Sequence, residues 1–203
     1  MELQFKETRV RACQDLARLN RSFQLAMESV VPDTRDDIGR ILSVRPEIYL
    51  KNKESKNKAV SFAGEAVVTV LYVNEEESAV SSFRFTQNFN QEYELPTAEE
   101  DDRLLLRFSA AAWQAKVLNP RKLSVDLEVS ADLSVSRSSE VVIDQGVPEP
   151  LPAPIHLQQT EASVVLTTGI SEKSFSINDQ LPFPADAAPP KEIIGKEIGR
   201  AHV

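Results

Sequence analysis

The chain is poor in the residues on which most enzyme chemistry depends. Its 203 residues include two histidines and one cysteine. His156 and His202 lie outside the segment with the regular apolar pattern described below, so neither is placed there as a base or metal ligand. Cys13 cannot form an intramolecular disulfide, and a single cysteine is typical of a reducing compartment. We expect a packed, inert thiol.

Long apolar runs and a basic face are also lacking. The run AVVTVLYV (residues 66–73) is far shorter than the ~18 residues of a membrane span, so we predict none. The N-terminus MELQFKETRVRA is charged where a secretory signal would be apolar. The net charge of −8, with acidic clusters at 74–78 and 98–102, would repel DNA or RNA. We therefore predict no nucleic-acid partner.

Recognisable catalytic and cofactor motifs are missing as well. The sequence has no nucleophile elbow, P-loop or dinucleotide fingerprint, and its acidic clusters lack the glycine-centred Asp/Asn alternation of a calcium loop. A carboxylate pair like that of glycosidases depends on spatial arrangement and stays open at this level. We predict a non-enzymatic protein with no catalytic residues, no cofactor and no metal site.

What the chain does have is strict alternation of apolar and polar residues. From Leu123 to Val135 every second residue is apolar and the residues between are polar, which predicts a half-buried strand. Thirteen residues exceed the usual strand length of about five or six, so we expect a bend, a bulge or a strand shared by two sheets.

Similar segments precede it, at 58–73, 81–95 and 104–118. The first is apolar on both faces in its C-terminal half, which predicts a central strand covered on both sides, with Gly64 as a bulge or a point of close approach. We predict at least five strands between Val44 and Ile143. The fold class is mainly β, an antiparallel β-sandwich-like module with little helix.

A proline-rich stretch divides the chain. DQGVPEPLPAP (144–154) carries four prolines, typical of a stiff, extended linker. We predict a complete β domain over residues 1–145, a linker over 146–154, and the N-terminal part of a second repeat over 155–203.

A weak internal copy supports the second repeat. Thr8, Ser22, Phe23 and Pro32 meet Thr160, Ser174, Phe175 and Pro184 at one constant offset. The copy predicts strands in both CQDLARLNRSF (13–23) and VLTTGISEKSF (165–175). It also suggests that the polypeptide is a fragment of a longer tandem protein.

Three motifs in order complete the pattern: VVPDTRDDIGRILSV (30–44), GEAVVTVLYVNEE (64–76) and LNPRKLSVDLEVSADLSV (118–135). Together they resemble the SPOCS domain of sporulation proteins, over about residues 5–140. The resemblance implies a mainly β module in spore-forming bacteria. It further implies a role in spore coat or envelope assembly, a location in the mother-cell cytoplasm or at the forespore surface and coat, and coat morphogenetic proteins as candidate partners.

The resemblance supplies no catalytic residues, so we predict a protein–protein interaction module. The candidate binding residues are Glu99, Glu100, Asp101 and Asp102 in one acidic loop, expected to be exposed, and Arg121 and Lys122 in the NPRK turn. Solvated surface turns are the plainer interpretation of both.

The alternative function is a carbohydrate- or peptidoglycan-binding β module, which would need exposed aromatic side chains. We expect Trp113 to be packed in the core instead. Strand order, oligomeric state and the identity of the partner do not follow from the pattern.

Overall fold

The computed structural model describes residues 7–144, 163, 165–173, 180 and 182. All of its strands lie between residues 7 and 144, and no described residue is helical. The strands are Glu7–Val30 (β1), Ile38–Lys56 (β2), Ala59–Asn74 (β3), Val80–Glu94 (β4), Arg103–Asn119 (β5) and Lys122–Asp144 (β6). The predicted β class is confirmed, as is a strand over 13–23 (in β1). The five strands predicted between Val44 and Ile143 are β2 to β6, although β2 begins earlier, at Ile38.

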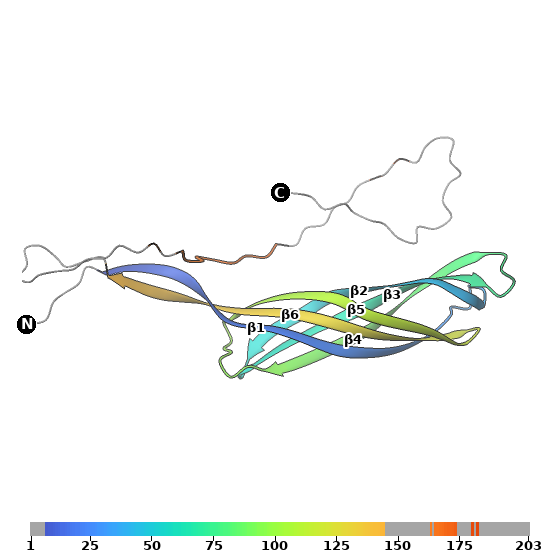
Figure 1. Ribbon diagram of the computed structural model, residues 1–203, viewed down its shortest axis with the longest axis horizontal. Helices are drawn as coiled ribbons and strands as arrows, with labels where there is room; N and C mark the ends of the chain where they lie inside the picture. The colour runs from blue at the N-terminus through green and yellow to red at the C-terminus, as the bar shows by residue number, and fades with distance from the viewer. Residues whose placement is uncertain (1–6, 145–162, 164, 174–179, 181, 183–203) are drawn as a thin grey trace, which may run out of the picture.

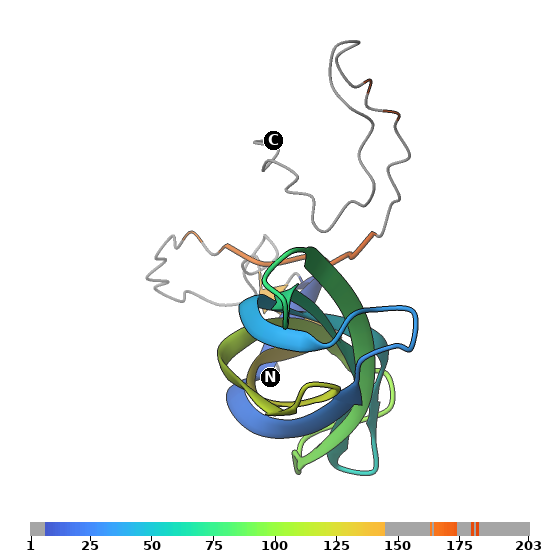
Figure 2. The same ribbon diagram turned by 90° about the vertical axis from the view of Figure 1, so that its right-hand side faces the viewer.

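The strands form two three-stranded antiparallel sheets, in the orders β1-β6-β5 and β2-β3-β4. The sheets curve around a shared interior, which gives the expected sandwich-like module (Figure 2). The chain crosses from the first sheet to the second through residues 31–37 and returns through residues 95–102. These two crossovers join the sheets covalently.

β6 is the central strand of the first sheet, and its alternation is borne out. Leu123, Val125, Leu127 and Val129 are fully buried, whereas Asp126 is exposed. The irregularities we expected in this long strand occur in its neighbours: the register shifts between Asp15 and Ala17 in β1, and at two points in β5. An edge strand can bulge without breaking a second ladder, so the edge strands take up the mismatch.

β1 and β6 continue beyond the rest of the fold. β5 pairs with β6 only as far as Ser136, whereas the pairing of β1 with β6 extends to Asp144. Residues 7–15 and 137–144 therefore form a two-stranded projection, called the arm below (Figure 1).

β3 is the central strand of the second sheet, as predicted. Its even-numbered apolar residues face the interior and are buried: Val60, Phe62, Ala66, Val68, Val70 and Tyr72. The expectation that both faces are covered holds at Val67, which is 8% exposed, but not at Leu71 and Val73 on the same outer face, which are only half-buried. A sandwich covers one face of each sheet, and no third layer is present in the described part of the chain.

Aromatic rings join strands of both sheets across the interior. Phe23 of β1 lies 5.2 Å from Phe89 of β4, and Phe62 of β3 lies 5.3 Å from Phe108 of β5, measured between ring centroids. Gly64 is a point of close approach, as proposed, because a Cβ atom there would collide with the backbone oxygen of Tyr49 and the ring of Phe89. A larger residue at this position would push β2 and β4 away from β3.

The predicted second repeat stays a prediction. Residues 165–173, where we expected strand, turn and strand, carry no assigned strand. The segment makes one backbone hydrogen bond to β1 and no continuous ladder among the described residues, so the alignment with residues 13–23 did not predict its local structure. The linker 146–154 and most of 155–203 lie outside the described residues.

The packing of β6 gives a direct test of which face is buried. Leu127 has 0% exposure, so Leu127→Asp should lower the free energy of unfolding by about 3–5 kcal/mol by burying an unpaired charge. Glu128→Lys, on the other face, should change it by less than about 1 kcal/mol. Urea unfolding followed by circular dichroism measures both, and equal losses would show that the faces are assigned wrongly.

Candidate functional site

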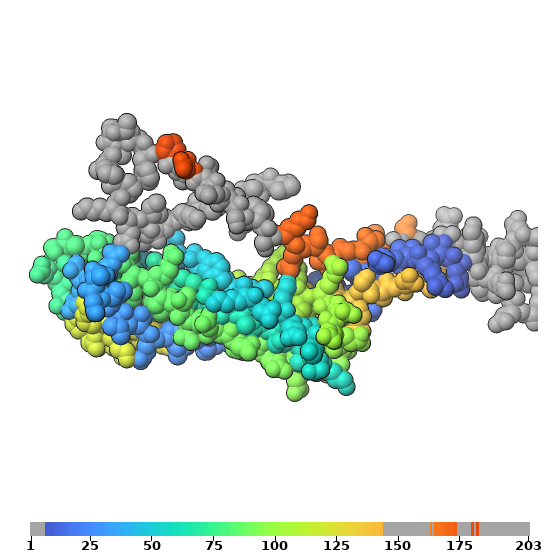
Figure 3. Space-filling view, turned by 180° about the vertical axis from the view of Figure 1, so that it is seen from behind, coloured from blue at the N-terminus to red at the C-terminus, as the bar shows by residue number. Residues whose placement is uncertain are grey.

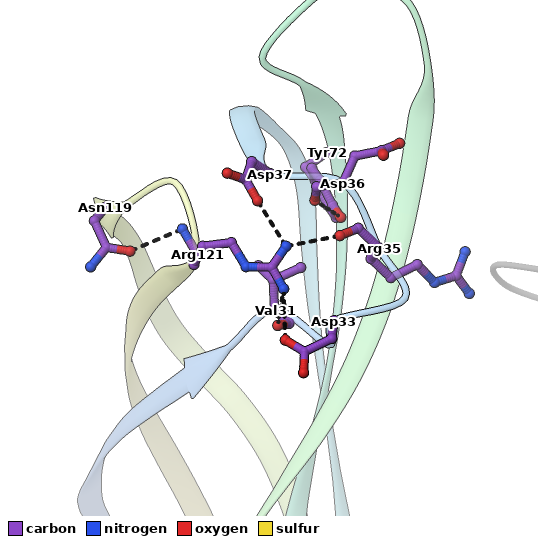
Figure 4. Close-up of polar contacts among 8 residues, drawn as sticks. All are labelled: Val31, Asp33, Arg35, Asp36, Asp37, Tyr72, Asn119 and Arg121. Carbon is purple, nitrogen blue, oxygen red and sulfur yellow. Dashed lines mark hydrogen bonds and ion pairs between the residues drawn. The ribbon is translucent and has the colours of Figure 1, made fainter.

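Arg121, in the turn between β5 and β6, ties that turn to the crossover between β1 and β2 (Figure 4). One guanidinium nitrogen donates to the backbone oxygen of Arg35 at 3.0 Å and to Oδ1 of Asp37 at 2.8 Å. The other donates to the backbone oxygen of Val31 at 3.0 Å and to Oδ1 of Asp33 at 3.2 Å. The planar fork of arginine suits such simultaneous contacts.

The backbone of the same turn strengthens this connection. Asn119 Oδ1 accepts from the Arg121 amide at 2.9 Å, which closes the turn. The Val31 amide donates to the Arg121 oxygen at 2.8 Å, and the Ile38 amide donates to the Pro120 oxygen at 2.7 Å. The NPRK turn and the PDTRDD crossover therefore form one structural unit.

A buried tyrosine anchors the middle of this crossover. The Tyr72 hydroxyl donates to the Asp36 backbone oxygen at 2.7 Å, and burial raises the pKa of Tyr72. The hydrogen bond to Asp37 raises the pKa of Arg121 above its already high value. Both groups keep their protons at physiological pH, so the network persists there.

Arg137 of β6 holds the second crossover in the same way. Its Nε donates to Asp102 Oδ1 at 2.6 Å and its Nη2 to Asp102 Oδ2 at 2.9 Å, a bidentate pair. It also donates to Glu99 Oε1 at 2.9 Å and to the Thr97 backbone oxygen at 2.7 Å. Asp102 Oδ2 accepts from the Glu99 amide at 2.8 Å as well.

The two clusters lie at opposite ends of the sheets. The chain passes from the 95–102 crossover to the NPRK turn along β5, whose seventeen residues span about 55 Å at ~3.3 Å each. No single compact ligand contacts both. The candidate residues therefore do not form one site.

Two of the candidates have structural roles. We expected Asp102 to be exposed, but its side chain has 0% exposure and pairs with Arg137, so that expectation was wrong. Arg121 retains 35% side-chain exposure, yet its guanidinium is committed to the crossover. An isolated buried carboxylate is costly, and a partner from a distant strand made burial possible.

The other candidates remain accessible to a partner. Glu100 and Asp101 are exposed at the tip of the acidic loop, and Glu99 is exposed although it pairs with Arg137. Lys122 forms an ion pair with Glu28 at 2.5 Å across the β1–β6 ladder. Whether any of these residues binds a protein stays a prediction.

The expectation that Trp113 is a core residue was wrong. It pairs with Leu127 in the β5–β6 register, which puts it on the core side, but its exposure is 47%. β5 is an edge strand with a register shift between Ala110 and Ala112, so the indole lies at the border of the sheet.

Sequence reasoning missed Arg137, although a signal was present. Arg137 occupies the inward phase that Leu123 and Val135 define. A cation at a core-facing position needs a buried or half-buried anion, and the acidic loop held the available carboxylates. The aspartates of the first crossover were not singled out because their partner is more than eighty residues away.

Comparisons with known proteins support the resemblance. A family model described as SipL, SPOCS domain, matches residues 37–118, which supports the predicted resemblance to the SPOCS domain. The match runs from the end of the first crossover through β5 and stops beside the NPRK turn. No curated protein and no solved structure matches the chain.

The described residues include no helix that could span a bilayer. Within the same residues, no group of three or more His, Cys, Asp or Glu side chains is arranged to hold a metal ion.

Arg121→Ala should lower the midpoint of thermal unfolding by several degrees, because it leaves two carboxylates and two backbone oxygens of one crossover without their shared donor. Arg121→Lys should recover only part of the loss, since an ammonium cannot reach all four acceptors. Lys122→Ala is the matched control and should have little effect, as its ion pair is on the surface. If Arg121→Ala and Lys122→Ala have the same midpoint of thermal unfolding, the stability of the crossover does not depend on Arg121.

Asp102 should add a pH-dependent contribution to stability. The hydrogen bond from Arg137 lowers the pKa of Asp102 below 3.8, so its contribution is fully present above that pH and is lost as the pH falls through the folded-state pKa. The stability gap between wild type and Asp102→Asn should therefore be widest at neutral pH and narrow below about pH 4. Chemical unfolding at a series of pH values measures it. Asp101→Asn, an exposed neighbour, should show no such narrowing, and a constant gap for Asp102→Asn would contradict the assignment.

Proposed function

We propose that this chain is a non-enzymatic protein-binding module of spore coat or envelope assembly, acting in the mother cell at or near the forespore surface. The match of residues 37–118 to the SPOCS family model supports a sporulation-related role. The assembly role and the location are our extension of that match.

The observation that carries the binding proposal is the arm. Along residues 137–144 of β6, the described structure contains no β5 partner, so backbone donors and acceptors are presented at an edge. A two-stranded ribbon is marginally stable alone in water. Exposed edges of this kind accept an additional strand from another protein. Val142 and Ile143 on the arm are exposed as well, which adds apolar surface for a partner.

The acidic tip beside the base of the arm supports the same proposal. Glu100 and Asp101 are exposed there, and the chain as a whole carries a net charge of −8. A partner with a basic surface would be attracted to this end, which speeds association more than it strengthens the final complex.

Reversing Glu100 and Asp101 to lysine should slow association with the partner and flatten its dependence on salt. Folding should be retained, because Glu99 and Asp102, which hold Arg137, are left unchanged. The partner is first captured from a sporulating-cell lysate with the full chain, and its binding kinetics are then measured at two salt concentrations.

The matched control reverses Glu75 and Glu76, two exposed carboxylates in the β3–β4 turn at the other end of the sheets. This variant has the same net charge and should associate at nearly the wild-type rate. Equal slowing in both variants would show a general charge effect and no directed surface. Failure to enrich any coat or envelope protein would contradict the proposal.

A carbohydrate- or peptidoglycan-binding role is the second candidate, favoured by one observation. Trp113 is half-exposed at a sheet border, where an indole can stack on a sugar ring. Co-sedimentation of the chain with purified peptidoglycan, lost in Trp113→Ala, would favour this role over protein binding.

A further inference from the structure

Residues 165–173, called the strap below, lie against the junction of the arm and the body (Figure 3). The Cys13 amide donates to the Thr167 backbone oxygen at 2.6 Å. Arg103 of β5 donates to the Ile170 backbone oxygen, and Lys53 of β2 pairs with the Glu172 carboxylate. Three strands from both sheets therefore hold one extended segment.

These contacts use the means by which domains bind extended peptides. A strand edge binds a backbone carbonyl, one cation binds a second carbonyl, and another cation binds an acidic side chain two residues later. Most of the contacts do not depend on the identity of the side chains, with the acidic residue as the exception. A segment of another protein with the same spacing can make all three.

The strap is held weakly. Most of its side chains are exposed, with Val165 at 99%, and only Leu166 and Ile170 are half-buried. The ion pair between Lys53 and Glu172 is partly solvated, so its net contribution is small. A segment with so little buried apolar surface can be displaced without unfolding the sheets.

The strap also fits its surface incompletely. A cavity of about 610 Å³ lies between the ends of β2 and β5 and the strap residues Ile170 and Glu172. Ser55 is among the residues that line it. The cavity has room for a further side chain, so an occupant that fills it makes contacts that the strap leaves unmade. Lys53 and Arg103 in the walls hold the acidic side chain and the carbonyl of the segment, whereas Glu54 and Glu100 favour a donor or a basic side chain beside them.

We propose that the strap occupies, within its own chain, the peptide-binding surface of this domain, formed by the β1 edge at Cys13 together with Arg103 and Lys53. The partner displaces it with an extended segment that places an acidic residue on Lys53 and a basic or donor side chain in the Ser55 cavity. This inference rests on the proposed protein-binding function. It identifies the surface and the chemistry of the segment that binds there.

The test uses the full chain and a fluorescent peptide of residues 163–173, SVVLTTGISEK. In the Glu172→Lys chain the strap is repelled by Lys53 while the surface stays intact. This chain should bind the peptide at least about tenfold more tightly than wild type, whose own strap competes at high effective concentration. A peptide with Glu172→Lys should bind the Glu172→Lys chain more weakly than the unchanged peptide does, because Lys53 repels its lysine. The Lys53→Glu chain should instead bind the Glu172→Lys peptide more tightly than the unchanged peptide.

Hydrogen exchange reports strap release independently. The Cys13 amide points away from β6 toward Thr167, so it should exchange faster in Glu172→Lys, whereas the Ala12 amide, which points to β6, should not change. The double variant Lys53→Glu with Glu172→Lys should restore protection at Cys13. A structural role of the ion pair that is unrelated to strap docking would not produce this rescue.

Other outcomes overturn the proposal. Absence of peptide binding to the Glu172→Lys chain, or equal binding of both peptides, would show that this surface does not select the segment. Dimerisation of the wild-type chain that Lys53→Glu abolishes would assign the surface to a second copy and not to a different partner. If the peptide test fails while partner association still depends on Glu100 and Asp101, the strap inference fails and the proposed function survives.

Discussion

The arrangement of the two sheets depends on two guanidinium groups, one just before β6 and one in its C-terminal half. Arg121 precedes β6 and Arg137 lies within it, and each donates to carboxylates and to backbone oxygens of a different crossover. The crossovers are the places where the chain passes between sheets. Fixing both from β6 sets how the second sheet lies on the first, because β2 and β4 enter and leave through those loops.

The same strand organises the interior. The buried side chains of β6 contribute to two adjoining apolar clusters, the first around Leu123 to Val129 and the second around Ala131 to Val135. Sheets with one buried face require this regular alternation, since a slip of one residue would turn every apolar side chain toward water. The hydrogen bonds of Arg121 and Arg137 and the apolar row between these two residues therefore all belong to β6 and the turn before it. The register shifts occur in the edge strands.

Arg121 and Arg137 are committed to the crossovers, so a partner is left the arm and the surface beneath the strap. The arm extends past β5 and past the aromatic interior, so its stability depends on what covers its edges. The strap covers one point of the β1 edge and bridges to Arg103 and Lys53 with little buried surface. A weak occupant of an edge next to a rigid body is an arrangement that a partner can replace at low energetic cost.

The strand class, the buried face of β6, the central position of β3 and the close approach at Gly64 could all be predicted from the sequence, because period-two patterning and glycine placement are local signals. The roles of Asp102, Arg121 and Trp113 could not. The first two are decided by partners from distant strands, and the third by a register shift in an edge strand. Sequence determined which residues face inward along each strand. Only the tertiary structure decided which charges meet, since ion pairs and strand edges depend on the position of strands that are far apart in the chain.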